Sequence, residues 1–423
     1  MNRRLDRLMA KVFRQGRLEV IWSDGSVSHY GGGGVHFAKL LFRDARAERA
    51  LLRNPELALG EAYMDRRIEF PDDTLLEFLL LADENWKHFS RIPIGATLAG
   101  IRFASRRWMQ NNSLVTARRN IAHHYDLDER LYRLFLDTDM QYSCAYFESP
   151  TAELEEAQWA KKRHLAAKLA LKPGQEVLDI GSGWGGLGLF LAENAGVNVT
   201  GVTLSSEQHR VSNQRARNQR LDRQVRFELQ DYRALDKTFD RIVSVGMFEH
   251  VGAARYGEFF RTVASLLKRN GVMLLHAIGR FGPPGATSPW IDKYIFPGVY
   301  APALSEVLAA IERVDLFVTD IEILRLHYAE TLRSWRQRFR THWVEAARIY
   351  DERFCRMWDF YLASCEAAFR SGSMMVFQIQ VTKNFHAVPL TRDYMFAAEA
   401  ALSAGSHTRK PREFRRRTAT TRR

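Results

Sequence analysis

The sequence predicts an α/β fold in which helices cover both faces of a parallel sheet. Apolar runs rich in β-branched residues alternate with helical patterns along the C-terminal two thirds of the chain. The hydrophobicity of these runs is continuous rather than alternating, as expected for strands that are buried on both faces. The predicted strands lie at 176–180, 197–204, 240–247 and 271–279, and the main predicted helices lie at 154–170, 205–221 and 255–268.

Length and composition indicate a folded protein of more than one domain. The chain has 423 residues, of which 46% are hydrophobic and 26% are charged. The longest apolar run, at 75–82, is too short to span a bilayer, and charges interrupt the N-terminus too early for a signal peptide. The three cysteines fit neither a disulfide framework nor a zinc site. We therefore expect a cytoplasmic protein that binds no metal.

Residues 1–90 predict a small α+β domain associated with lipid or membrane. A hairpin is expected at 16–30, followed by a flexible stop at the glycines 31–34 and by helical patterns at 37–52 and 74–89. The chain begins with an amphipathic helix, which either packs on its own domain or lies on a membrane surface. The apolar face of this helix comprises Leu5, Leu8, Met9, Val12 and Phe13.

An excess of basic residues favours a polyanionic partner. The chain has 62 Lys and Arg against 49 Asp and Glu, a net charge of +13, which suits nucleic acid or an anionic membrane surface. A basic linker at 91–122 contains arginines and aromatic residues without acidic ones, and it either binds phosphates or headgroups or is simply solvated. A basic tail at 405–423 is expected to be disordered.

A glycine turn follows the first predicted strand of the sheet. Gly181, Gly183 and Gly186 satisfy the dinucleotide pattern G-x-G-x-x-G, but the next strand ends in residues 203–205, Thr-Leu-Ser, and lacks the acidic residue that would hold a ribose of NAD. A carboxylate, Asp179, instead lies two residues before the first glycine. This arrangement suits S-adenosylmethionine, which has no pyrophosphate but has an amino group that needs acceptors. It predicts a Rossmann-like class I methyltransferase sheet.

At this point the chain resembles the cyclopropane-fatty-acyl-phospholipid synthases, within the wider group of mycolic-acid cyclopropane synthases. The resemblance is strong over 123–396 and weaker in the first domain, so we assign 123–404 to a catalytic domain. One departure is Ser182, where the family usually has a cysteine. The matching segments are 124–126 (HYD), 140–146 (MQYSCAY), 178–186 (LDIGSGWGG), 201–208 (GVTLSSEQ), 230–233 (QDYR), 244–252 (SVGMFEHVG), 274–278 (LLHAI) and 289–297 (PWIDKYIFP), together with Tyr328.

The resemblance implies a site for S-adenosylmethionine, in which Gln208 would hold the ribose. The residues that match the cofactor-binding stretches of the family are Tyr142, Ser143, Asp179, Gly181, Ser182, Gly183, Gly185, Thr203, Leu204, Ser205, Gln208, Asp231 and Tyr232.

The resemblance also implies a bicarbonate site. Its residues are Cys144, Glu249, His276, Ile278 through its backbone, and Tyr328. Taken alone, Glu249 beside a histidine is more often structural, and His276 in an apolar strand is more often a core histidine. Positions 276 and 278 share one strand face near the end where open α/β sheets bind ligands, whereas Tyr328 rests on resemblance alone. Cys365, which some family descriptions mark as active, lies in an apolar helical pattern and is expected to be a packed cysteine.

The chemistry of the family explains these residue types. Methyl transfer to an unactivated cis alkene leaves a carbocation on the acyl chain, which aromatic faces stabilise by ~0.5–2 kcal/mol each. Ring closure then removes a proton, which needs a base that does not trap the cation, such as bicarbonate. Aromatic residues close to the motifs are Tyr142, Tyr146, Phe147, Phe248, Trp290 and Tyr328.

We therefore expect an enzyme that converts an unsaturated phospholipid into its cyclopropane derivative at the inner face of the membrane. A related lipid methyltransferase that leaves a methylene or methyl branch is the main alternative. A nucleic-acid methyltransferase is disfavoured because no base-flipping motif is present, so no nucleic-acid partner is expected. A lipid-binding protein with a decayed site is disfavoured because the full set of motif residues is present. The sequence leaves acyl-chain and headgroup preference open, as well as the oligomeric state, a homodimer included.

Overall fold

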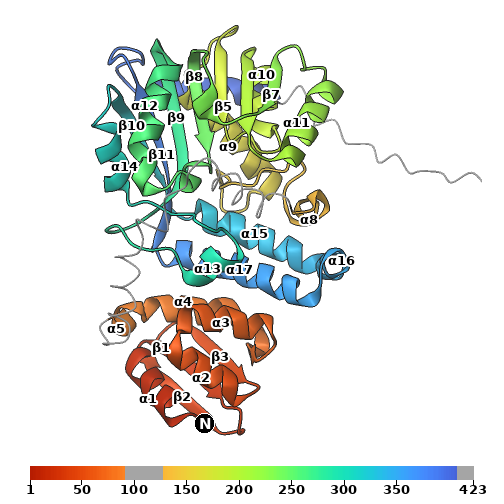
Figure 1. Ribbon diagram of the computed structural model, residues 1–423, viewed down its shortest axis with the longest axis vertical. Coiled ribbons are helices and arrows are strands. Elements are labelled where there is room, and N and C mark those ends of the chain that lie inside the picture. The colour runs from red at the N-terminus through yellow and green to blue at the C-terminus, as the bar shows by residue number, and fades with distance from the viewer. Residues whose placement is uncertain (91–126, 407–423) are drawn as a thin grey trace, which may run out of the picture.

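A computed structural model describes residues 1–90 and 127–406. In Figure 1 the N-terminal domain, a helical layer and a large sheet follow one another along the long axis of the molecule. The predicted linker at 91–122 and nearly all of the predicted tail lie outside the described residues. Among the described helices, none is both long and apolar enough to cross a bilayer.

The N-terminal domain has a four-stranded sheet of order β2-β1-β3-β4. The expected hairpin is confirmed, since β1 and β2 pair in antiparallel register. The strands are β1 (Gly16–Ile21), β2 (Val27–Gly33), β3 (Phe37–Phe42) and β4 (Ile68–Glu69). The helices are α1 (Arg3–Val12), α2 (Ala45–Arg53), α3 (Pro55–Met64), α4 (Leu75–Glu84) and α5 (Trp86–Ser90).

Two local predictions in this domain are wrong. The helix expected at 37–52 begins only at Ala45, because the preceding residues form β3, in which Ala38, Leu40 and Phe42 are buried in alternation with more exposed residues. The expected glycine stop is part of β2. Gly31 adopts φ +100°, and a Cβ there would lie 2.0 Å from the carbonyl oxygen of Gly16, so the close strand approach needs glycine.

The amphipathic helix α1 packs on its own domain. Leu5, Met9, Val12 and Phe13 are buried in the hydrophobic core that includes α2 and β1. Asn2 caps the helix by accepting from the backbone N–H groups of residues 4 and 5. The apolar face of α1 is therefore not available to a membrane surface, and of the two interpretations the packed helix is confirmed.

The catalytic domain contains a seven-stranded sheet of order β10-β11-β9-β8-β5-β6-β7. The four predicted strands are confirmed as β5 (Glu176–Ile180), β6 (Asn198–Thr203), β8 (Phe239–Val245) and β9 (Leu267–Arg280), all in parallel pairs. The sheet is mixed rather than purely parallel, because β11 pairs antiparallel with both β9 and β10. The strands that the sequence did not predict are β7 (Val225–Leu229), β10 (Phe317–Leu324) and β11 (Met374–Thr382).

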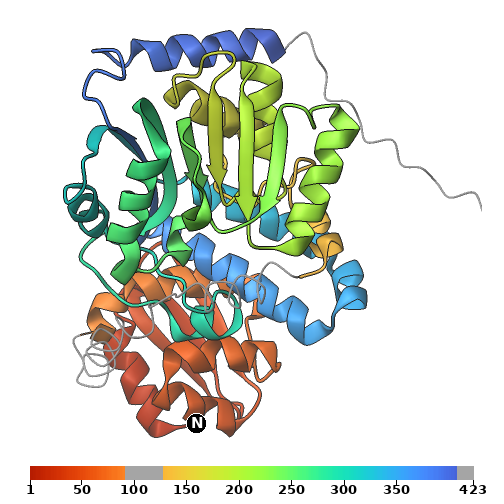
Figure 2. The ribbon, with the colours of Figure 1, turned by 45° about the horizontal axis from the view of Figure 1, so that its top comes forward.

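Helices cover both faces of this sheet, as predicted. One face packs against α12 (Tyr256–Leu266) and α14 (Leu304–Ile311), and the other against α9 (Leu154–Lys168) and α10 (Gly186–Ala195). Figure 2 shows α18 (Asp393–Ser406) running across the end of the domain, and it packs on α9. The remaining helices are α8 (Glu129–Phe135), α11 (Ser206–Gln219), α13 (Pro289–Tyr294), α15 (His327–Thr341), α16 (Trp343–Ile349) and α17 (Glu352–Arg370).

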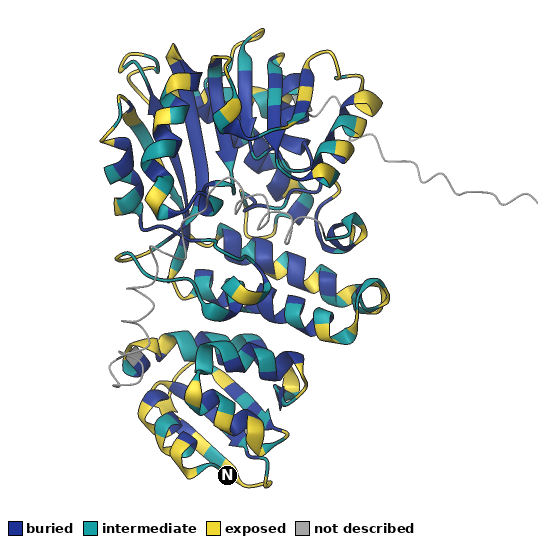
Figure 3. Ribbon diagram, in the orientation of Figure 1, coloured by how far each residue is buried: buried dark blue, intermediate teal, exposed yellow. Residues whose placement is uncertain are grey.

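The two domains share one hydrophobic core. The cluster that contains the apolar face of α1 continues through α4 into α15 and α17, which lie between the N-terminal domain and the sheet (Figures 1 and 3). Asp359 on α17 is fully buried in this layer. Its carboxylate accepts from Tyr63 Oη of the N-terminal domain at 3.0 Å and from the Nε atoms of Arg336 and Arg340 at 2.8 and 2.7 Å. The helical layer is thus fixed from both sides.

Candidate active site

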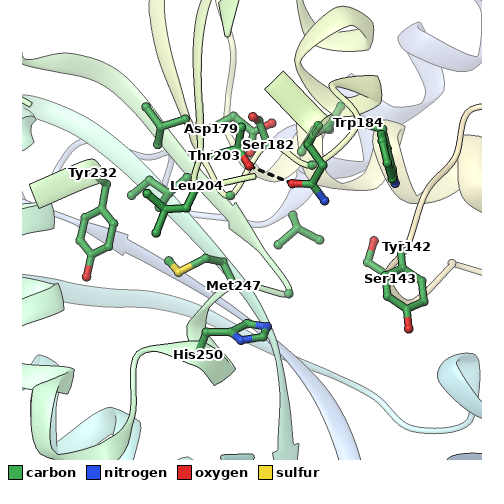
Figure 4. Close-up of a pocket in the computed structure, with 18 of the residues that line it drawn as sticks. Tyr142, Ser143, Asp179, Ser182, Trp184, Thr203, Leu204, Tyr232, Met247 and His250 are labelled. Carbon is green, nitrogen blue, oxygen red and sulfur yellow. Dashed lines mark hydrogen bonds between the residues drawn. The ribbon is translucent and has the colours of Figure 1, made fainter. Parts of the chain in front are cut away.

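A pocket opens at the carboxyl ends of β5, β6, β7 and β8, where open α/β sheets bind ligands. Figure 4 shows the side chains that face it from the loops after these strands and from the segment at 140–143. The predicted cofactor residues that line it are Tyr142, Ser143, Asp179, Gly181, Ser182, Gly183, Thr203, Leu204, Gln208, Asp231 and Tyr232.

The glycine turn after β5 is shaped by left-handed backbone. Gly181 and Gly185 adopt φ values of +83° and +84°, and a Cβ at either position would lie 2.7 Å from Met247 or from Phe227. Only glycine fits such a conformation without strain. Gly185 does not line the pocket, but it is the N-cap of α10, so its role is to bring the start of that helix to the pocket.

Asp179 lies at the end of β5 with one oxygen unused. The side chain is 2% exposed, and its Oδ2 atom has no hydrogen-bond partner among the described residues. Burial raises the pKa of this carboxyl to about 7, partly offset by Lys161. A buried carboxyl without a protein partner that lines a pocket can accept a hydrogen bond from a ligand, and a ligand ammonium would favour its ionised form.

The loops after β6 and β7 complete one wall. Thr203 Oγ1 donates to Gln208 Oε1 at 2.8 Å, which fixes the orientation of that amide at the pocket. Ser205, predicted to bind the cofactor, does not line the pocket and instead caps α11 by accepting from the backbone N–H of residue 208. Asp231 accepts two hydrogen bonds from the guanidinium of Arg233 at 2.8 Å each, which fix the orientation of its carboxylate.

The segment at 140–143 forms the opposite wall. Tyr142 shares a hydrogen bond of 2.9 Å with the hydroxyl of Tyr361, and its ring packs 5.2 Å from that of Trp335. The Nε2 atom of Gln158 on α9 donates to the carbonyl of Ser143 at 3.0 Å. This buried amide therefore fixes the backbone that presents both predicted cofactor residues.

The structure brings Glu249 and Ile278 of the predicted anion site into direct contact. The Ile278 N–H donates to Glu249 Oε1 at 2.6 Å, whereas Oε2 is buried without a partner among the described residues. The backbone N–H through which Ile278 was expected to bind an anion is therefore engaged by the glutamate in this structure. Burial raises the pKa of Glu249 to about 7.

The other predicted anion-site residues are buried. His276 pairs with Gln378 at 3.2 Å through Nδ1, and burial lowers its pKa to about 3. The Cys144 thiol donates to the carbonyl of Ala145 at 3.3 Å, and burial raises its pKa well above the ordinary value. Tyr328 lies in the first turn of α15 against the ring of Phe369, 4.8 Å away. Together with Glu249 and Ile278, these residues lie outside the lining of the cofactor pocket.

Cys365 fits the expectation of a packed cysteine. It lies on α17 against the core cluster, and burial raises the pKa of its thiol to about 12. The thiol is therefore protonated at neutral pH and is a poor nucleophile.

Several residues of the site escaped the sequence analysis. Trp184, Met247 and His250 line the pocket, and burial lowers the pKa of His250 to about 4. Gln158 and Lys161, three residues apart on α9, are almost completely buried. No signal in the sequence separates this pair from its neighbours, because α9 also buries Lys162, His164 and Lys168.

Comparison with known proteins gives the family. The family described as mycolic acid cyclopropane synthetase matches residues 112–379, and a domain of unknown function matches residues 5–89. The chain is 40% identical to the cyclopropane-fatty-acyl-phospholipid synthase of Escherichia coli (strain K12), over 78% of this chain and 84% of that protein. It is 35% identical to the tuberculostearic acid methyltransferase UfaA1 of Mycobacterium tuberculosis, over 88% of this chain and 89% of that protein.

Solved structures agree with the fold. The mycolic acid cyclopropane synthase CmaA1, determined with SAH and CTAB, superimposes with a TM-score of 0.60 at 36% identity, covering 62% of this chain and 97% of that one. The family match extends over more than half of the chain, and the E. coli enzyme is matched along most of its length. This chain therefore belongs to the mycolic acid cyclopropane synthetase family and is an S-adenosylmethionine-dependent methyltransferase.

Proposed function

We propose that this protein converts a cis double bond in a membrane phospholipid acyl chain into a cyclopropane ring, with bicarbonate as the base for the departing proton. The choice of a phospholipid substrate rests on how much of this chain each relative matches. CmaA1 is matched over 97% of its own length but only 62% of this chain, whereas the E. coli phospholipid enzyme aligns with 78% of this chain. This chain has an N-terminal domain outside the part that matches the mycolate-type enzyme, and this domain favours a phospholipid substrate.

In this proposal the pocket residues orient the cofactor and exclude water. S-adenosylmethionine supplies an electrophilic methyl group, and bicarbonate supplies a base. Asp179 Oδ2 accepts from the α-amino group of the cofactor, and Gln208 binds its ribose. The aromatic side chains beside the pocket, Tyr142 and Tyr328 among them, stabilise positive charge on the acyl chain. His250 in this pocket is a weak base, because burial lowers its pKa to about 4, and therefore competes little for the departing proton.

The proposed anion site fits bicarbonate in its chemistry. Glu249 Oε2 is a buried oxygen that lacks a partner among the described residues, so it can accept from the hydroxyl of bicarbonate. The raised pKa of Glu249 allows it to retain or share a proton, which reduces repulsion between the two acids. His276, neutral and buried, donates without competing for the departing proton.

Labelled lipid products would test this function. Purified protein is incubated with methyl-labelled S-adenosylmethionine and vesicles of cis-monounsaturated phosphatidylglycerol, and the extracted lipid is analysed by mass spectrometry and proton NMR. We expect label in the acyl chain and ring protons at high field. Vesicles of saturated phosphatidylglycerol are the control and should gain no label. Absence of label from both vesicle types would refute the proposal.

The similarity to UfaA1 favours one second candidate. That enzyme is named as a methyltransferase, and it aligns with more of this chain than the E. coli synthase does. The same carbocation can lose its proton elsewhere to leave a methylene or methyl-branched chain. Olefinic signals in place of high-field ring protons would support this candidate.

A further inference from the structure

Lys161 on α9 is a buried cation that the sequence analysis did not place in the site. Its side chain is 1% exposed, yet it lines the cofactor pocket. Its Nζ atom donates to Ser143 Oγ at 2.8 Å and to Gln141 Oε1 at 2.7 Å, and both acceptors are neutral. No carboxylate of the described residues lies within ion-pair distance of it. An ammonium in such a position is costly unless an anion completes its environment.

The neighbouring carboxylates are already engaged by other cations or by backbone. Asp139 forms ion pairs with Lys162, at 2.6 Å, and with Arg215. Asp137 accepts from the backbone N–H groups of residues 139 and 141. Three cations therefore face these two carboxylates, and the third carboxyl nearby, that of Asp179, has a pKa raised to about 7, so positive charge is in excess at the pocket wall. Burial also lowers the pKa of Lys161 to about 8, as expected for a cation whose charge is incompletely balanced.

The pocket also contains the complementary group, Asp179. Its unpartnered Oδ2 atom lines the same pocket, and the two side chains are close enough for Lys161 to lower the pKa of that carboxyl. The amino-acid end of S-adenosylmethionine is a zwitterion with one ammonium and one carboxylate. A buried acceptor and a buried cation on one pocket wall match these two charges.

We propose that Lys161 binds the α-carboxylate of S-adenosylmethionine while Asp179 binds its α-amino group, so that α9 selects the zwitterionic end of the cofactor. The inference rests on the proposed use of this pocket for the cofactor. Ser143 and Gln141 then serve as positioning residues, because they hold the ammonium towards the pocket. Bicarbonate is the other oxyanion that this lysine could bind. The charge of Lys161 also lowers the pKa of Cys144 and of His276, two residues of the predicted bicarbonate site. Because Lys161 lines the cofactor pocket, we favour the α-carboxylate of the cofactor as its partner.

Binding measurements with two ligands test the assignment. S-adenosylhomocysteine carries the amino-acid end, and 5′-methylthioadenosine lacks it. By isothermal titration, Lys161→Met should bind S-adenosylhomocysteine about 10- to 100-fold more weakly than wild type, the effect of losing a charge-assisted hydrogen bond. Its affinity for 5′-methylthioadenosine should change less than threefold. Equal losses for both ligands would overturn the proposal and indicate a structural role.

Lys162→Met is the matched control. Lys162 is the adjacent residue of α9 and is also buried, but it does not line the pocket. The substitution should lower thermal stability and leave the ratio of the two affinities at the wild-type value. If the ratio falls as far as in Lys161→Met, the positive charge of the pocket wall, rather than contact with Lys161, sets the preference for S-adenosylhomocysteine. That result would overturn the proposal.

Two further outcomes keep the inference separable from the proposed reaction. If Lys161→Met binds S-adenosylhomocysteine normally but no longer responds to added bicarbonate, the lysine serves that anion and the proposal is wrong. If Lys161→Met does not fold, wild type is titrated with decarboxylated S-adenosylhomocysteine, which should bind at least tenfold more weakly than the parent. A loss below threefold would refute the carboxylate contact. None of these results depends on which lipid product forms.

Discussion

Two buried carboxyl groups, Asp179 and Glu249, each retain one oxygen without a partner in the described part of the chain. Burial raises the pKa of both groups to about 7. Groups of this kind destabilise the folded protein when they ionise, and such shifts are typical of functional sites. The sequence indicated Asp179 through its place before the glycine turn and Glu249 through the family resemblance. Their unsatisfied oxygens depend on neighbours from distant strands and could not be predicted.

The Glu249→Gln substitution should separate catalysis from cofactor binding. The amide is close in size and can still accept from the Ile278 N–H, but it cannot exchange a proton. We expect turnover to fall by about 10²- to 10⁴-fold, while S-adenosylhomocysteine binds within threefold of wild type by titration. Glu312→Gln, at an exposed position, is the control and should change neither quantity. A weakened affinity with unchanged turnover would contradict the assigned role.

Asp179→Asn should stabilise the unliganded protein at neutral pH. The folded-state pKa of about 7 lies above the ordinary value of 3.8 for an aspartate, so the unfolded state loses its proton first as pH rises. The folded state therefore loses stability between about pH 4 and pH 7. The amide removes this cost, and we expect a gain of about 4 kcal/mol at pH 8. Urea unfolding at pH 5 and pH 8 measures it, and an equal gain at both values would contradict the assignment.

At the scale of elements, strands with continuous apolar runs could be predicted from the sequence, whereas the pairing of the other strands could not. The strands β5, β6, β8 and β9 are buried on both faces, so their continuous apolar runs identify them directly. In contrast, β3 was mistaken for the start of a helix, because its pairing with β1 is set by contacts between separate segments. The same reason hides β10 and β11, which pair antiparallel at the edge of a predicted parallel sheet.

The contact between α3 and α13 gives a test of helix packing. A Cβ at Gly60 on α3 would lie 2.3 Å from Nε1 of Trp290 on α13, whose side chain is fully buried. Gly60→Ala should therefore destabilise the protein by about 1–3 kcal/mol in spite of the higher helix propensity of alanine. Gly257→Ala on α12 is the control, because its Cβ would meet only the tip of Arg261. Chemical denaturation compares them, and equal effects would contradict the packing argument.

At the scale of the whole molecule, the net charge of +13 remains the main argument for an anionic membrane surface. Its two most basic segments lie largely outside the described residues, and the apolar face of α1 is buried, so docking through that face is excluded. Membrane association therefore stays a prediction that depends on charge. The sequence predicted the family and most of the sheet, but it could not show that α1 faces inward, because amphipathicity alone does not identify what covers the apolar side.

Deletion of residues 408–423 tests the contribution of charge. This segment has eight basic residues and one acidic residue, and each basic residue near an anionic surface contributes about 1 kcal/mol at most. We expect weaker sedimentation with phosphatidylglycerol vesicles at low salt and unchanged turnover at saturating lipid. A shuffled segment of the same composition should restore binding. Vesicle binding that is unaffected by the deletion would place the docking surface elsewhere.

The hydrophobic core that the two domains share determines how the protein unfolds. Since α4 packs against α17 and Asp359 depends on Tyr63 from the first domain, neither half can open without exposing apolar surface and an under-solvated carboxylate of the other. Heating should therefore melt both halves in a single endotherm, with a calorimetric enthalpy equal to the van't Hoff enthalpy. Two separate transitions would show independent units. The first ninety residues are in this respect an inner support of the enzyme and not a removable attachment.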